Sequence, residues 1–142
     1  MNEQIFFETL TKEKEWCTSY CYLLNYFFSS YHSVEDMRNI LQYIRSIKAS
    51  EIKIDDWNSF EWRGVVCFRK EYVMIIDEKV FEVGNKLPGL KNEDGSNLLN
   101  ASYEWIIDTD YIENNYSQFI KIPIDEFDSI TCQWIAFLEG KV

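Results

Sequence analysis

The sequence predicts an α+β domain, with an N-terminal helical hairpin packed on a mostly antiparallel sheet and a C-terminal helix. Two changes of pattern lead to this class. Apolar residues in the first 50 positions recur with spacings of three and four, as on a helix, and from about residue 52 they alternate with a period of two, as on a strand. With 142 residues, 46% of them hydrophobic, the chain is expected to form one domain over residues 1–142.

The first helix is expected to run from Trp16 to about Tyr31 and to be buried on more than one side, because its apolar face is wide. Its apolar positions are Trp16, Cys17, Tyr20, Cys21, Leu23, Leu24, Phe27, Phe28 and Tyr31. After a break at 31–33, Ser33 is placed to cap a second helix whose first turn carries Glu35 and Asp36. The inner stripe of this second helix is predicted to be Val34, Met37, Ile40, Leu41, Ile44 and Ile47.

Strands are predicted from Ile52 onward. The alternating segments are 52–54, 60–68, 72–76, 80–83 and 101–107, with a further strand at 119–122 and a hairpin turn at 77–78. Residues 84–100 are expected to form the main loop. An antiparallel meander is the simplest way to connect these strands.

The C-terminal segment fits two patterns. A helix beginning near Asp125 or Asp128 would align Phe127, Ile130, Trp134 and Phe137 or Leu138, whereas 130–132 and 134–135 suit a strand equally well. We predict the helix, because Gly140 follows where a helix stop belongs.

Charge is the one global property that is unusual. The formal net charge is −10, and residues 101–142 contain 8 acidic and 2 basic side chains, a balance of −6. Nucleic acid and anionic membranes reward Lys and Arg, so neither is expected as a direct ligand. A concentrated negative field favours a cationic partner instead. The N-terminus lacks the pattern of a secretory signal and no long apolar run exists, so we expect a cytoplasmic protein without a membrane span.

No motif points to catalysis, a metal or a cofactor, and none of these is expected. His32 is the only histidine and lies in a predicted turn without a local Cys–His signature. Cys17 and Cys21 lack the Cys-x-x-Cys spacing of zinc sites and fall within the apolar stripe. The acidic turn at 91–97 does not match a calcium loop, because the first and twelfth ligand positions hold Leu90 and Ala101. The four cysteines are expected to be free thiols.

Acidic residues stand beside large aromatic residues in two regions. Interfaces draw much of their binding energy from a few Trp, Tyr and Arg side chains, while surrounding charge selects the partner. The predicted partner-binding residues are Glu104, Asp108, Asp110, Tyr111 and Glu113 in one region, and Asp55, Asp56, Trp57 and Glu61 in the other. The alternative is that the rings are core and the acids only maintain solubility.

In general build, as a small, acidic, aromatic-rich α+β chain without catalytic residues, the protein resembles the immunity proteins of bacterial polymorphic and contact-dependent inhibition toxins. The resemblance implies a protein partner, a basic toxin domain often of the nuclease type, neutralised by occlusion of its active site or of another surface it needs. Two other functions stay open. One is a phage-type nucleic-acid mimic that inhibits a host enzyme, and the other is a small hydrolase with a dispersed carboxylate or cysteine site.

Overall fold

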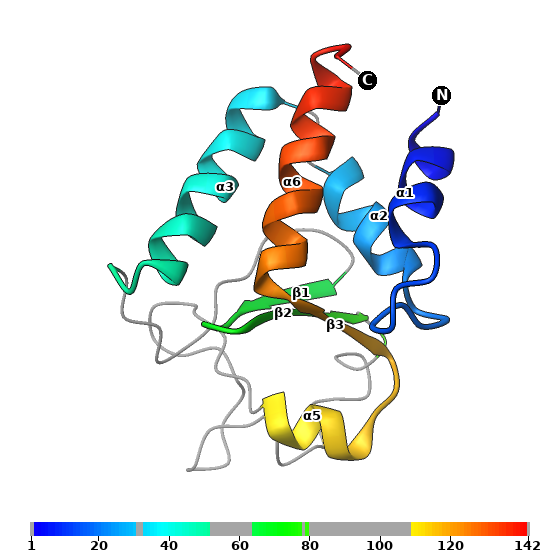
Figure 1. Cartoon of the computed structure of the whole chain (residues 1–142). Coiled ribbons are helices and arrows are strands. Elements are labelled where there is room, and N and C mark those ends of the chain that lie inside the picture. The colour runs from blue at the N-terminus through cyan, green and yellow to red at the C-terminus, as the bar shows by residue number, and fades with distance from the viewer. Residues whose placement is uncertain (1, 31–32, 52–63, 78, 80–108, 142) are drawn as a thin grey trace.

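The computed structural model describes residues 2–30, 33–51, 64–77, 79 and 109–141. In these ranges the helices are α1 (Glu3–Thr11), α2 (Tyr22–Ser29), α3 (Val34–Lys48), α5 (Thr109–Asn115) and α6 (Ile124–Leu138). The strands are β1 (Gly64–Phe68), β2 (Tyr72–Asp77) and β3 (Phe119–Pro123). This combination of helices with an antiparallel sheet confirms the predicted α+β class (Figure 1). None of the helices described here has the length and apolar character needed to cross a membrane.

The three described strands form one sheet in the order β1-β2-β3, and both neighbouring pairs are antiparallel, as predicted. Ile75 on the central strand is in register with Val66 of β1 and Ile120 of β3. The N–H of Arg69 donates to the carbonyl of Tyr72 at 2.9 Å and closes the turn between β1 and β2. The strands predicted at 52–54, 60–62, 80–83 and 101–107, and the turn predicted at 77–78, lie wholly or partly outside the described residues.

The two faces of the sheet are covered by different helices. Helices α1, α2, α3 and α6 lie on one side of the sheet, and α5 lies on the other (Figure 1). Because side chains alternate along a strand, Val73 and Ile75 join the main core under the first group of helices, while Met74 and Ile76 are buried outside that cluster. The same alternation turns Asp77, at the end of β2, toward the side of α2.

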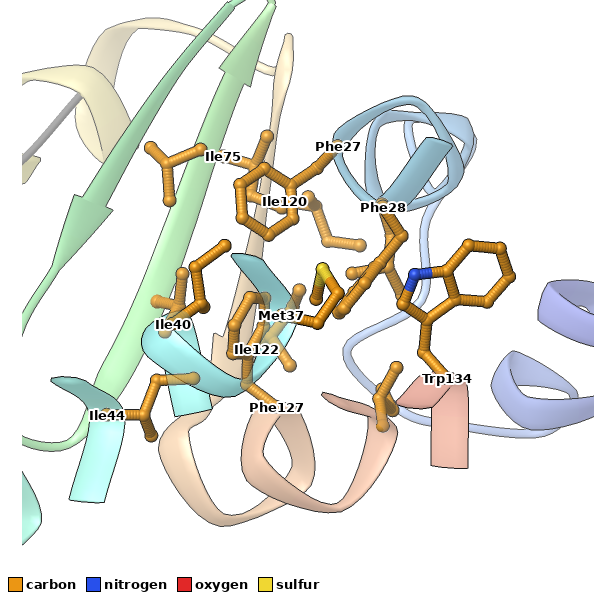
Figure 2. Packing of buried hydrophobic residues seen from close by; sticks show 14 of the residues in the cluster. Phe27, Phe28, Met37, Ile40, Ile44, Ile75, Ile120, Ile122, Phe127 and Trp134 are labelled. Atoms are coloured by element: carbon orange, nitrogen blue, oxygen red, sulfur yellow. The ribbon is translucent and has the colours of Figure 1, made fainter. Parts of the chain in front are cut away.

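The centre of the core is aromatic. The ring centroid of Phe127 on α6 lies 5.8 Å from Phe27, 5.5 Å from Phe28 and 6.2 Å from Phe68. Figure 2 shows these α2 and α6 rings beside the isoleucines of the sheet and of α3. Trp134 lies seven residues further along α6, belongs to the same core and is fully buried. Phe127 therefore links α2, α6 and β1 in one contact group.

The helix predicted to start at Trp16 was placed wrongly, because α2 begins only at Tyr22. Residues 12–21 form turns, and Glu13 has a left-handed backbone with φ 65°, which ends helical geometry at this point. The rings of Trp16 and Tyr20 still pack against the core from this segment, which explains their helix-like spacing. Helix α1, which that spacing does not predict, precedes the turns and is capped by the side chain of Asn2.

The predictions for α3 and α6 are confirmed. Ser33 caps α3 by accepting a hydrogen bond from the N–H of Asp36 at 3.3 Å, and the stripe of α3 is turned inward. Gly140 has φ +73° just after α6, in the left-handed conformation expected of a helix stop. Helices α2 and α3 follow each other along the chain, but α6 lies between them in space (Figure 1). Helix α3 accordingly packs along α6.

Candidate protein-binding surface

The carboxylates of α6 are held in ion pairs with bases from the first half of the chain. The pairs are Asp125 with Lys48 (2.7 Å), Glu126 with Lys14 (3.2 Å), Asp128 with Arg45 (3.5 Å) and Lys48 (3.3 Å), and Glu139 with Arg38 (2.9 Å). Hydrogen bonding to Asp125 raises the pKa of Lys48 and keeps this base charged. The expected concentration of outward negative field in residues 101–142 therefore does not hold along α6, where neighbouring cations compensate the carboxylates.

The predicted cluster at 104–113 is described only from residue 109 onward. Asp110 and Glu113 both lie on α5, three residues apart. Asp110 is exposed, whereas Glu113 pairs with Lys121 of β3 at 2.9 Å. The hydrogen bond that Lys121 donates to Glu113 raises the pKa of Lys121. The Nζ of Lys121 also lies 4.3 Å from the ring centroid of Tyr72. Lys121 thus offsets part of the negative charge of the cluster.

The other predicted binding residues lie beyond what the structure describes. Glu104, Asp108, Asp55, Asp56, Trp57 and Glu61 are outside the described ranges, and so is the side chain of Tyr111. Of the predicted set, the structure brings together Asp110 and Glu113.

A groove of about 440 Å³ runs beside Glu113, between the turns at 12–21 and the α5–β3 region. Its aromatic lining comes from Trp16, Tyr20, Tyr116 and Phe119. The indole Nε1 of Trp16 is buried and finds no hydrogen-bond partner among the described residues. We call this cavity the α5 groove.

Three tyrosines have neighbouring rings, one of them lining the α5 groove and two on α2. We call Tyr20, Tyr22 and Tyr26 the tyrosine row. The ring centroids of Tyr20 and Tyr22 are 6.0 Å apart, and those of Tyr22 and Tyr26 are 5.6 Å apart in a T-shaped arrangement. Tyr22 and Tyr26 are each 40% exposed, which sets them apart from the buried phenylalanines of the same helix. Large apolar rings held at the surface are typical of binding sites.

A second cavity, of about 430 Å³, separates α1 from α2, and we call it the α1–α2 groove. Tyr22 and Tyr26 form its α2 side, while Phe7 and Glu8 belong to its α1 side. Glu8 is exposed, and its Oε1 accepts a hydrogen bond from the side chain of Gln4 at 3.1 Å. Among the described residues, no lysine or arginine lines this groove.

The side chain of Tyr22 is held in position by a hydrogen bond to a buried carboxylate. Its hydroxyl donates to Oδ2 of Asp77 at 2.5 Å, and Asp77 is only 5% exposed. The other carboxylate oxygen accepts the N–H of Lys79 at 2.9 Å. Within the described part of the chain, no lysine or arginine side chain forms an ion pair with Asp77. Burial and the contact with Asp77 raise the pKa of Tyr22, so the phenol stays protonated and oriented at neutral pH.

The tyrosine row and Asp77 were missed by the sequence patterns, although one signal was present. Tyr22 and Tyr26 are four residues apart and fall outside the predicted apolar stripe, so a helix would place both on its outer face. An aromatic pair on a helix surface indicates a contact beyond the core. The sequence pattern predicts a turn at Asp77, and the contact of this residue with Tyr22 depends on tertiary structure.

The cysteines are free, and three of them, Cys21, Cys67 and Cys132, have little nucleophilic character. Burial raises the pKa of Cys67 to about 12. Burial, together with the neighbouring thiol of Cys17, raises the pKa of Cys21 to about 12, and burial also raises that of Cys132. These thiols are therefore protonated at neutral pH. No group of three or more His, Cys, Asp or Glu in the described ranges could hold a metal ion.

The raised pKa of Cys67 predicts a loss of stability at alkaline pH. A group whose pKa is higher in the folded state stabilises the fold below its unfolded pKa, and this contribution is lost as pH rises toward the folded pKa of about 12. The free energy of unfolding should thus fall above about pH 8.5, with a slope approaching 1.4 kcal/mol per pH unit from this thiol. Urea unfolding at pH 8 and pH 10.5 measures the loss, which Cys67→Ala should reduce. An equal loss in the variant would contradict the assignment.

No family model, curated protein or solved structure matches this chain. The fold and the surface just described are therefore the basis for a functional assignment.

Proposed function

We propose that this chain is an immunity protein, a cytoplasmic acidic domain that binds a cognate basic toxin of the nuclease type and neutralises it. The observation that carries the proposal is the exposed pair Tyr22 and Tyr26 beside a groove that has a carboxylate and no cation on its described walls. Tyrosine is one of the side chains that anchor protein interfaces, because its ring buries a large area and its hydroxyl still forms hydrogen bonds.

Charge supports a cationic partner. The formal net charge of −10 attracts positively charged proteins over long range and raises the rate of encounter. A nuclease presents Lys and Arg to the phosphates of its substrate. A domain that covers such a surface with carboxylates and rings would block access to nucleic acid without any catalytic step. Tyr20 lines the α5 groove and its ring lies beside that of Tyr22, so this groove adjoins the tyrosine row.

The two other functions have less support. A nucleic-acid mimic needs a surface of carboxylates free to imitate phosphates, and those of α6 are paired with lysines and arginines. A cysteine hydrolase needs a thiolate, and the thiols of Cys21, Cys67 and Cys132 are held in the protonated form at neutral pH.

The test is binding to the protein domain encoded next to this chain. Calorimetric titration should detect a complex whose affinity falls as salt is raised. Formation of this complex should abolish the toxicity of the domain. Tyr22→Ala should weaken the complex by about 2 kcal/mol or more, the range of an interface anchor. Asp110→Lys should mainly slow association. Glu51→Lys, at an exposed position after the C-terminal end of α3, serves as the charge-matched control. At high salt, where the general effect of net charge is screened, it should leave the affinity within about twofold of wild type.

Absence of any complex with the neighbouring domain, at low salt and with both proteins folded, would remove the immunity assignment. A complex equally weakened by Glu51→Lys and Tyr22→Ala would show that net charge alone drives binding, which also contradicts a specific tyrosine surface.

A further inference from the structure

We propose that the α1–α2 groove is a subsite for one arginine side chain of the protein partner, held between the rings of Tyr22 and Tyr26 and the carboxylate of Glu8. The subsite is part of the proposed function, and it rests on that function for one point, namely that the arginine belongs to a protein partner. The lining residues of the groove come from α1, from α2 and from the residue just before α2. Helices α1 and α2 lie next to each other (Figure 1).

The size of the groove suits a single long side chain. Its volume of about 430 Å³ lies at the lower end of the range of small-molecule sites, about 300–1,000 Å³. Phe7, which is 4% exposed, belongs to the hydrophobic core and gives the groove an apolar wall. An aliphatic stem can lie against such a wall while its charged head stays at the rim.

The electrostatics of the groove favour a cation. The carboxylate of Glu8 lies at its rim, and no basic side chain competes for it among the described lining residues. The thiol of Cys21, which also lines the groove, is uncharged at neutral pH because burial raises its pKa to about 12. The hydroxyl of Tyr22 donates its hydrogen bond to Asp77, so its oxygen keeps lone pairs that can accept from an incoming donor.

The geometry favours guanidinium over ammonium. Tyr22 and Tyr26 meet at 80° with centroids 5.6 Å apart, and both rings line the groove. A planar guanidinium stacks on an aromatic face and still directs N–H groups to acceptors in its own plane. Glu8 and the oxygen of Tyr22 are acceptors of that kind. An ammonium, which is a strongly hydrated point charge, would use fewer of these contacts.

The first experiment uses a defined probe and no toxin. The isotope-labelled protein is titrated with the peptide acetyl-Gly-Arg-Gly-amide, and with matched lysine and citrulline peptides, while amide chemical shifts are followed. We expect saturable shifts confined to residues 4–11 and 21–26, with the citrulline peptide binding about tenfold more weakly because it lacks the charge. Shifts that are absent, or that centre on α5 or α6, would overturn the proposal, as would equal binding of the citrulline peptide. Stronger binding of the lysine peptide would overturn the choice of arginine.

Single substitutions at exposed positions of the groove test the subsite with little effect on folding. Glu8→Gln changes one exposed side chain by charge alone and should weaken binding of the arginine peptide about tenfold. Tyr26→Leu removes a ring and should weaken it by a similar factor. Glu51→Gln, also exposed but in the segment that follows α3, should leave binding unchanged. Unchanged binding in both groove variants would overturn the proposal.

The same variants in the neighbouring-domain titration separate the two proposals. If the arginine peptide occupies the groove but the neighbouring domain does not bind, the immunity assignment fails and the arginine subsite stands. If the neighbouring domain binds wild type, Glu8→Gln and Tyr26→Leu equally well, the arginine subsite is overturned while the immunity assignment stands.

Discussion

Replacing Phe127 with alanine is expected to lower the free energy of unfolding by about 3–5 kcal/mol, the range for removing a fully buried aromatic ring. The ring of Phe127 is fully buried and contacts rings from α2 and from β1, so its loss leaves a cavity where three elements meet. Urea denaturation followed by circular dichroism measures the change.

A second variant at the same position serves as the control for this prediction. Phe127→Leu retains most of the buried apolar volume and should cost less than half as much as alanine. A loss below about 1 kcal/mol for Phe127→Ala would contradict the central position of this ring, since only a site able to collapse fully around the gap shows so small an effect.

Lys48→Glu is expected to lower the free energy of unfolding by about 1–2 kcal/mol at low salt, because it replaces attraction by repulsion at two carboxylates. The Nζ of Lys48 lies 2.7 Å from Asp125 and 3.3 Å from Asp128, and the Asp128 side chain is only 14% exposed. Thermal and urea unfolding at low salt and in 1 M NaCl measure the effect, which salt should reduce.

The control for Lys48→Glu is Lys70→Glu, which makes the same change of net charge in the exposed turn between β1 and β2. It should alter stability by no more than about 0.5 kcal/mol, as ordinary surface substitutions do. Equal destabilisation by the two variants would mean that net charge matters and that the pairing of α3 with α6 does not.

Elements with a strong one-sided pattern could be predicted from the sequence. The stripe of α3 has a regular period with a cap at Ser33, and α6 has a glycine stop at Gly140, so local signals and burial agree. The turns at 12–21 could not be predicted. They partly bury Trp16 and Tyr20 at spacings that a helix would also give, and the left-handed backbone at Glu13 leaves no mark in the hydrophobic pattern.

The candidate surface was only partly predictable for a related reason. The acidic balance of residues 101–142 is a property of sequence, but its compensation depends on Arg38 and Lys48 crossing to α6, over separations that local patterns do not reach. The contact between Tyr22 and Asp77 joins a helix to the end of a strand 55 positions away. The composition predicts a surface of charge and rings, whereas the pairing of each carboxylate with a cation depends on the fold.

Site-specific photo-crosslinking to the neighbouring domain tests most directly whether the partner sits on the tyrosine row. A benzophenone side chain is placed at Tyr26 or, in a second variant, at Gln133, which is exposed on α6. We expect a covalent product from position 26 and none from position 133. Crosslinking from position 133 alone would place the partner on α6 and contradict a binding surface formed by α1 and α2.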